Sequence, residues 1–493
     1  MSKYILELTV FICGAVIMIF ELVGSRVLGP YFGTSIFVWT SLIGIILGSL
    51  SLGYYLGGKI ADKKPDVKNL SLIIFFAAIF IGITTAVKGV LLVFLQFNIL
   101  DVRISSVIAS FLLFLPASVL LGMIAPYAAK LTLDDLDNSG ATIGNLYALS
   151  TAGSICGTFL AGFFLIPHFG TNKLLIIISI ILVLVSLALY TKEFKKIKSY
   201  ALIFLIFGWV MISGFSYVNA KNGFIDVDTA YNRIWIYDYT DVETGKMAKM
   251  MGINNENHSS MFLDSDELVS EYSKYYHLAR YFHPDLKTAL MLGGAGYSYP
   301  KYFLRTYPEA TMDVVEIDPE ITQLAKKYFR LKEDPRLNIY HKDGRVYLNK
   351  TDKKYDVIFG DAFGAHYSVP YQLTTKEATE RIYDILEDDG IVILNIISAL
   401  EGEKSWFFQA EYATYASIFP QVYVFPVKDL ENAENRQNIM LIALKTEKEY
   451  TFESDDEQLQ QYLQHLWKKE IITDKLILTD DYAPVDYYVN KAF

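Results

Sequence analysis

The chain is 493 residues long, 52% of them hydrophobic, and its formal net charge is −10. This acidic balance excludes nucleic acid as a partner, because phosphate binding needs a basic surface. Only two cysteines are present, Cys13 and Cys156, and both lie in apolar stretches. A disulfide framework and a cysteine metal site are therefore excluded, and we expect no bound metal.

The first 218 residues contain seven apolar stretches that are each long enough to cross a bilayer. About 20 residues of helix span the ~30 Å hydrocarbon core. We expect these helices at about 5–28, 37–58, 70–94, 104–129, 144–166, 171–190 and 200–218. Residues 1–218 are therefore predicted to form an all-α transmembrane bundle of about seven helices, with the lipid bilayer as its partner.

Small and ionisable residues within this region bear on packing and function. Glycines four residues apart let helices approach closely, and they recur as Gly44 with Gly48, Gly53 with Gly57, and Gly153 with Gly157. In the helix 37–58 this spacing serves either a homodimer face or packing within one chain. Glu21 and Arg26 are functional candidates because they lie at membrane depth, although Arg26 can also extend to the interface.

Lysines gather in two loops on one side of this bundle: Lys59, Lys63, Lys64 and Lys68, then Lys192, Lys195, Lys196 and Lys198. The positive-inside rule makes these loops and the N-terminus cytoplasmic. Seven crossings would then place everything after residue 218 outside the cell. An eighth crossing, or a re-entrant segment between residues 70 and 130, would place it inside instead, so the side of the C-terminal half stays open.

From Phe224 onward, short β-rich runs alternate with amphipathic helices. Alternating runs within 224–265 predict a small antiparallel sheet. Strand-like runs then follow at 288–293, 312–317, 337–341, 355–360, 391–397, 421–427 and 438–444. Helical patterns between several of them predict a doubly wound, Rossmann-like α/β sheet. We therefore divide this half into a small β-subdomain, 219–270, and a Rossmann-like domain, 271–493.

Polar residues and glycines follow the strands of this predicted sheet, at the edge where ligands of open α/β sheets bind. They follow the first four strands in turn: Gly293, Gly294 and Gly296; Glu316 and Asp318; Asp343 and Gly344; and Asp361. Glu316 comes about 20 residues after the glycines, where an acid can bind both ribose hydroxyls. Tyr299 stands where a dinucleotide fingerprint needs a third glycine, which disfavours a pyrophosphate. The set therefore indicates a nucleoside without phosphates, with S-adenosylmethionine or a relative as the candidate. Such donors are made in the cytosol, so this chemistry favours a cytosolic C-terminal half, whereas the lysine distribution favours one outside the cell.

Residues 224–493 resemble the spermidine synthase family, the polyamine aminopropyltransferases. The resemblance rests on "YNRIW", "SSMFLDSDE", "KYYHLA", "LMLGGAG", "VVEIDPEI", "DGRVYL" and "YDVIFGDAF", which follow the family's order. The whole chain is similar to the membrane-embedded members, in which a multi-helix bundle precedes the synthase domain.

This resemblance implies an enzyme that transfers an aminopropyl group from decarboxylated S-adenosylmethionine to a small-molecule amine, releasing methylthioadenosine. It assigns ribose binding to Glu316, adenine contact to Asp343 and Gly344, and activation of the amine to Asp361. A carboxylate suits that last role, because it attracts a cationic amine and can accept its proton. The substrate-binding residues that the resemblance implies are Tyr231, Tyr276, His277 and His366.

Three carboxylates that are usual in the family are missing from this chain. Ala295 stands where an acid binds the donor's amino group, Leu278 stands in place of a glutamate, and no second acid follows Asp361 closely. The acceptor is therefore unassigned, and the donor is either decarboxylated or intact S-adenosylmethionine. Asp480 and Asp481 are candidates for replacement charges. Two alternatives stay open: an S-adenosylmethionine-dependent methyltransferase, and a non-catalytic sensor or transporter of polyamines or nucleosides.

Overall fold

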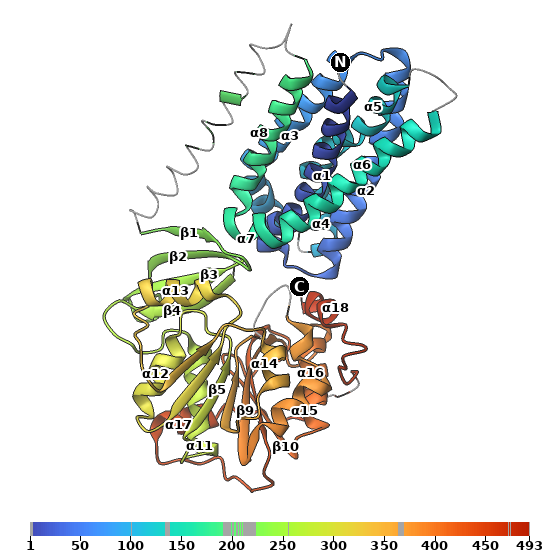
Figure 1. Cartoon of the computed structure of the whole chain (residues 1–493). Helices are drawn as coiled ribbons and strands as arrows, with labels where there is room; N and C mark the ends of the chain where they lie inside the picture. Colours follow the sequence, from blue (N-terminus) through green and yellow to red (C-terminus); the bar gives the residue numbers. More distant parts are fainter. Residues whose placement is uncertain are drawn as a thin grey trace. The chain divides into compact units, whose positions relative to one another are not determined.

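The computed structural model describes residues 3–99, 101–133, 139–190, 223–254, 256–362, 369–471, 473 and 475–492, together with 199, 202, 203, 206, 208 and 210. The chain divides into two compact units. The first comprises Met1–Asn222 with Asp226–Arg233, and the second comprises Gly223–Ile225 with Ile234–Phe493. Figure 1 shows the first as a bundle of helices and the second as a mixture of strands and helices.

Within the described part of the first unit, six spans are long and apolar enough to cross a membrane. They are α1 (Lys3–Phe32), α2 (Ile36–Lys63), α3 (Val67–Asn98), α4 (Val102–Gly122) with α5 (Ile124–Thr132), α6 (Ser139–Leu160) with η1 (Ala161–Leu165) and α7 (Ile166–Phe169), and α8 (Thr171–Leu189). Six of the predicted apolar helices are thus present, while the seventh, 200–218, lies largely outside the described residues. Between residues 70 and 130 the described residues form two candidate spans, α3 and α4–α5, and no additional one.

Glycines bring some of these helices into backbone contact. A Cβ added to Gly53 would lie 2.3 Å from a backbone oxygen of α4, and one added to Gly153 would lie 2.0 Å from a backbone oxygen of α1. These two glycines therefore serve packing within one chain. Gly44 and Gly48, by contrast, meet nothing within 4 Å, so their face of α2 is open in the single chain.

The predicted small sheet comes next along the chain. Its strands lie in the order β1 (Ile225–Asp228), β2 (Arg233–Thr240), β3 (Met247–Ile253) and β4 (Glu256–Phe262). β3 pairs antiparallel with both β2 and β4. A loop then leads from β4 to α10 (Glu271–Tyr275), η2 (Tyr276–Leu278) and α11 (Ala279–Phe282).

A seven-stranded sheet forms the rest of the unit, in the order β10-β11-β9-β8-β5-β6-β7. Its strands are β5 (Thr288–Leu292), β6 (Thr311–Val315), β7 (Leu337–Tyr340), β8 (Tyr355–Gly360), β9 (Leu386–Ser398), β10 (Gln421–Pro426) and β11 (Gln437–Leu444). β11 runs antiparallel to both of its neighbours, and the pairs from β7 to β9 are parallel. All seven predicted strands are therefore present, and the predicted Rossmann-like fold class is confirmed.

Helices cover both faces of this sheet. They are α12 (Ser298–Thr306), α13 (Pro319–Tyr328), α14 (Gly344–Lys350), α15 (Lys376–Asp384), α16 (Trp406–Ala416), α17 (Glu457–Leu463) and α18 (Val485–Val489), with the short turns η3 (Tyr371–Leu373), η4 (Glu403–Ser405) and η5 (Asn490–Ala492). Along β5, Ala289 and Met291 pack in one hydrophobic cluster, and Leu290 and Leu292 pack in the other. This alternation is the period of a strand buried on both faces.

The order of the strands reverses at β5, which pairs with β6 on one side and β8 on the other. Ligands of open α/β sheets bind at such a switch point, beyond the carboxyl ends of the strands. The ends of β5 and β8 are therefore the place to look for a site.

Candidate functional site

The turn after β5 has an unusual backbone that its residues explain. Gly293, Ala295 and Tyr297 have φ values of +99°, +42° and +53°, so three residues lie in the left-handed region. A Cβ on Gly294 would lie 2.7 Å from the ring of Tyr297, and that ring is fully buried. Position 294 therefore requires glycine because a larger side chain would collide with the ring of Tyr297. Position 293 requires glycine because its φ angle lies in the left-handed region.

Glu316 holds this turn in place. One carboxylate oxygen accepts hydrogen bonds from the backbone N–H groups of Gly294 (3.0 Å) and Ala295 (3.2 Å), and the other accepts from the N–H of Asp318 (3.0 Å). Burial raises the pKa of Glu316, and these three hydrogen bonds oppose that shift. The carboxylate predicted to bind ribose therefore lies directly beside the glycine turn and fixes its shape.

Asp361 follows β8 and lies against the same turn. Its backbone N–H donates to the carbonyl of Leu292 (3.0 Å), which continues the pairing of β8 with β5. A Cβ on Gly293 would lie 3.4 Å from the Asp361 backbone. The chain therefore brings the glycine turn and this carboxylate together through the parallel pairing of two strands that are far apart in sequence.

Neutral donors hold the Asp361 carboxylate. The amide of Asn395, on β9, donates to Oδ1 (3.1 Å), and the hydroxyl of Tyr272, on α10, donates to Oδ2 (3.2 Å). Desolvation raises the pKa of Asp361 to about 6, while hydrogen bonds from Asn395, Tyr276 and Tyr272 act in the opposite direction. A carboxylate with this pKa is ionised at neutral pH and can still take up a proton.

A narrow pocket lies over these groups. Its walls come from the small sheet, the α10 segment, the glycine turn and the end of β8. The lining residues are His258, Ser259, Ser260, Ser270, Tyr272, Ser273, Met291, Gly294, Ala295, Ser298, Tyr299 and Asp361. Burial lowers the pKa of His258 to about 4, so its imidazole is neutral at physiological pH.

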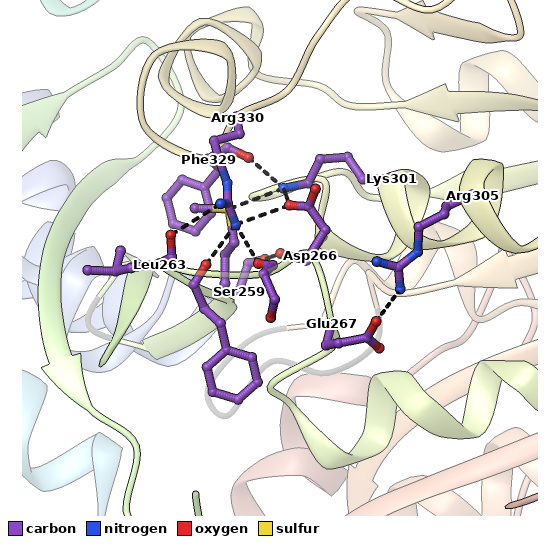
Figure 2. Close-up of polar contacts among 12 residues, drawn as sticks. Ser259, Leu263, Asp266, Glu267, Lys301, Arg305, Phe329 and Arg330 are labelled. Carbon is purple, nitrogen blue, oxygen red and sulfur yellow. Dashed lines mark hydrogen bonds and ion pairs between the residues drawn. The ribbon is translucent and has the colours of Figure 1, made fainter. Parts of the chain in front are cut away.

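A polar clamp secures the loop that leads from β4 to α10, and it is drawn in Figure 2. Asp266 pairs with Lys301 of α12 (3.7 Å) and with Arg330 (3.1 Å), and Glu267 pairs with Arg305 (2.7 Å). Arg330 also donates to the carbonyls at the end of β4 and in the loop. The clamp thus fixes the start of the segment that presents Tyr272 to Asp361.

Four other predicted site residues, Gly296, Asp318, Asp343 and Gly344, lie in the glycine turn or at the starts of helices. Asp343 caps α14 by accepting from the N–H of Val346 (3.0 Å), with Gly344 beginning that helix. Gly296 lies in the turn, where a Cβ would meet Ser259 Oγ at 2.6 Å. Asp318 is fully buried and caps α13, which is a structural task.

The predicted substrate-binding residues are not all brought together. The ring of Tyr276 is buried against Tyr299 and Phe359, and its hydroxyl bonds to Asp361. His277 is buried too, but its ring contacts Tyr302 and Tyr307 and does not line the pocket.

Two further predicted residues, Tyr231 and Asp480, lie elsewhere. Tyr231 belongs to the first compact unit, where its carbonyl accepts from Arg26. His366 lies outside the described residues. Asp480 bonds to Arg345 (2.7 Å) and to Thr375 (2.7 Å), so it does not supply the missing charge at the pocket.

Comparison with known proteins agrees with this geometry. Residues 269–447 match the family model described as the spermine/spermidine synthase domain. These residues carry a spermidine synthase domain.

Relatives match the synthase domain and, in one case, more of the chain. A polyamine aminopropyltransferase from Vibrio vulnificus is 34% identical over 149 residues, which are 30% of this chain and 48% of the relative, so the chain spans about half of that relative's length. Polyamine aminopropyltransferase 1 from Streptomyces coelicolor is 22% identical over 454 residues, 86% of this chain and 82% of its own, so that alignment must include N-terminal helices. The solved structure of a probable spermidine synthase from Corynebacterium glutamicum is 24% identical, covering 46% of this chain and 81% of its own with a TM-score of 0.40.

Three residues of the synthase site were not predicted from the sequence: Tyr272, Asn395 and His258. Asn395 is the one with a readable signal, because it is a lone amide in the apolar run of β9 and is buried. A buried polar side chain in such a run needs a partner, and here the partner is Asp361. Tyr272 and His258 carry no comparable signal.

Proposed function

We propose that the protein transfers an aminopropyl group from decarboxylated S-adenosylmethionine to a small-molecule amine. The amine lone pair forms a new C–N bond, the C–S bond breaks, and its electron pair stays on sulfur in methylthioadenosine. The amine loses one proton, which needs an acceptor. The observation that carries the proposal is Asp361, held by two donors in a pocket beside the glycine turn.

Each proposed role follows from a residue's place. Asp361 attracts the cationic amine, keeps it in line with the sulfonium carbon, and accepts its proton. Glu316 and the turn of Gly293, Gly294 and Gly296 hold the ribose side of the donor. Asp343 with Gly344, after the third parallel strand, contacts the adenine.

Product analysis tests this proposal. The purified full-length protein is incubated with a polyamine mixture and with either intact or decarboxylated S-adenosylmethionine. We expect methylthioadenosine together with an amine that has gained an aminopropyl group. Release of S-adenosylhomocysteine would instead indicate a methyltransferase, and calorimetric binding without either product would indicate a sensor or transporter.

We also propose that the first unit anchors the protein in a bilayer as a multi-pass bundle. The support is the six apolar spans in the described part of that unit. Their lysine-rich turn, between α2 and α3, carries Lys63 and Lys64 at one end of the bundle. At that end Lys130 of α5 pairs with Asp62 (3.0 Å).

The segment that leads out of this unit lies at the opposite end of the bundle. Asp226–Arg233 belongs to the first unit. Within it, Asp228 accepts from the N–H of Thr171, where α8 begins (3.0 Å), and the carbonyl of Thr229 accepts from Arg26, near the end of α1 (2.8 Å). We therefore propose that the synthase domain and the lysine-rich turn lie on opposite sides of the membrane. By the positive-inside rule the lysine-rich turn is cytoplasmic, so we propose that the synthase domain lies on the outer side of the membrane.

A further inference from the structure

Asp361 has two oxygens in different surroundings. Oδ1 faces the amide of Asn395, whose exposed fraction is 3%. Oδ2 faces the hydroxyl of Tyr272, which can rotate about its C–O bond. A rotating hydroxyl can donate to a carboxylate or accept from a carboxylic acid, whereas an amide N–H₂ can only donate.

Asn395 is prevented from turning over by a second amide. Its own carbonyl oxygen accepts a hydrogen bond from Nδ2 of Asn438, on the neighbouring strand β11 (2.8 Å). If Asn395 turned, its N–H₂ group would face the N–H₂ of Asn438 and its oxygen would face the Asp361 carboxylate. Both contacts would then be repulsive, so Asn438 fixes the direction of the whole chain of hydrogen bonds.

Tyr272 has a second acceptor within reach. Its hydroxyl lies 3.2 Å from Oδ2 of Asp361 and 3.4 Å from the backbone carbonyl of His258. When Oδ2 gains a proton, the hydroxyl of Tyr272 can accept it in a hydrogen bond and donate its own hydrogen to that carbonyl. The amide of Asn395, which holds Oδ1, cannot rearrange in this way, because it can only donate.

We propose that Asn438, acting through Asn395, keeps Oδ1 of Asp361 as an acceptor only and so makes Oδ2, beside Tyr272, the atom that receives the proton of the amine. Asn395 and Asn438 are positioning residues in this scheme. The inference rests on the proposed function for the origin of the proton. The assignment of Oδ2 of Asp361, and not Oδ1, as the proton acceptor rests on the geometry alone.

Few other groups near Asp361 change charge close to neutral pH. Among the described residues, the titratable side chains facing it are Tyr272 and Tyr276 on the α10–η2 segment, His258 on β4 and Tyr299 on α12. Burial raises the pKa of each tyrosine well above its ordinary value and lowers that of His258 to about 4. Among these described groups, the one whose pKa lies near 6 is Asp361.

Replacing Asn438 by aspartate tests the inference. Asn438→Asp preserves shape but removes the donor, so Asn395 should turn its N–H₂ toward residue 438 and its oxygen toward Asp361. Asn438 also lines a second pocket, so the new carboxylate can be solvated. Because a new charge also acts through space, the substitution is made both in the natural chain and in an Asn395→Leu background.

Two readouts are used on the full-length protein: the pH profile of methylthioadenosine release, and infrared titration of the Asp361 carboxyl, identified by difference from Asp361→Asn. We expect Asn438→Asp to move both midpoints upward by roughly one to two pH units, and to move them much less in the Asn395→Leu background. Asn349→Asp, on the surface of α14, is the matched control and should move neither.

Equal shifts in both backgrounds would overturn the inference, because they would show that the charge at 438 acts without Asn395. An unchanged midpoint in Asn438→Asp would overturn it as well. A natural protein that releases no methylthioadenosine would contradict the proposed function alone, since the infrared titration still decides which way Asn395 points.

Discussion

The hydroxyl of Tyr272 lies 3.2 Å from Oδ2 of Asp361, although the two residues are 89 positions apart. This hydrogen bond lowers the pKa of Asp361 against the larger effect of desolvation, which raises it to about 6. It joins the α10 segment, fixed by the clamp around Asp266, to the end of β8. The basicity of the proposed proton acceptor therefore depends on a residue from a different part of the fold.

Tyr272→Phe removes this donor and should make Asp361 more basic. Activity needs the ionised carboxylate, so in the natural protein it should fall as pH drops through about 6. In the variant that acid limb should move upward by roughly one unit, lowering activity about fivefold at pH 6 and much less at pH 8. The measurement is the rate of methylthioadenosine release from pH 5 to 9. Tyr328→Phe, on α13, is the control, and identical profiles for all three proteins would contradict the assigned role.

Glu316→Gln should weaken donor binding without unfolding the domain. The carboxylate of Glu316 accepts three backbone hydrogen bonds, and a glutamine amide must turn its N–H₂ group toward at least one of those donors. We expect calorimetric affinity for the adenosyl donor to fall roughly 10- to 100-fold. Glu309→Gln, an exposed carboxylate before β6, is the matched control. Unchanged affinity in Glu316→Gln would show that the turn does not depend on this carboxylate.

Glu411 predicts an unusual dependence of stability on pH. It is fully buried in α16, and neither carboxylate oxygen has a hydrogen-bond partner among the described residues. Desolvation raises its pKa well above the ordinary value of 4.5. The folded state therefore binds the proton more tightly than the unfolded chain. Its contribution to stability is complete below pH 4.5 and is lost as the pH rises above that value.

Glu411→Leu should remove the loss of stability that the buried carboxyl group causes as the pH rises. Thermal unfolding of the full-length protein between pH 5 and 8 should show a shallower decline for the variant, with a gain of about 1–3 kcal/mol at pH 8. Glu457→Leu, at the start of α17, provides a substitution of the same kind on an exposed carboxylate. A pH slope that is the same in the natural protein and in Glu411→Leu would show that Glu411 is not protonated in the fold.

Sidedness can be measured with single cysteines. Cys13 and Cys156 are replaced by serine, and a cysteine is then introduced by Val242→Cys, in the turn after β2, or by Lys63→Cys, at the end of α2. Val242 is 96% exposed, so a reagent can reach it. A membrane-impermeant maleimide added to intact cells should label Val242→Cys and not Lys63→Cys. Labelling of both, or of neither until the cells are lysed, would contradict the opposite-sides proposal.

The sequence was informative where one local rule decides the structure. Alternation of apolar residues places β5 between two layers, and parallel pairing then brings the residues after β5 and β8 to one edge. Gly293 and Asp361 could therefore be predicted as neighbours from their positions after strands. Apolar length alone likewise gave the six spans of the first unit.

Other features depend on contacts that no local pattern contains. Tyr272 bonds to Asp361 from a segment whose preceding loop is held by the clamp, and the ring of His277 contacts Tyr302 and Tyr307 instead of the pocket although it adjoins Tyr276. Asp318 precedes Pro319, a sequence that starts a helix as readily as it marks a ribose site, and the helix cap is what forms. Side-chain direction in such places is set by tertiary packing.

The central claim is tested most directly by comparing methylthioadenosine release between the natural protein and Asp361→Asn. Both are purified at full length and supplied with decarboxylated S-adenosylmethionine and a polyamine mixture. The natural protein should release methylthioadenosine in equal amount to the aminopropylated amine, and Asp361→Asn should be slower by roughly 10²- to 10⁴-fold with unchanged unfolding temperature. Equal rates in the two proteins, or no methylthioadenosine from the natural one, would contradict the account.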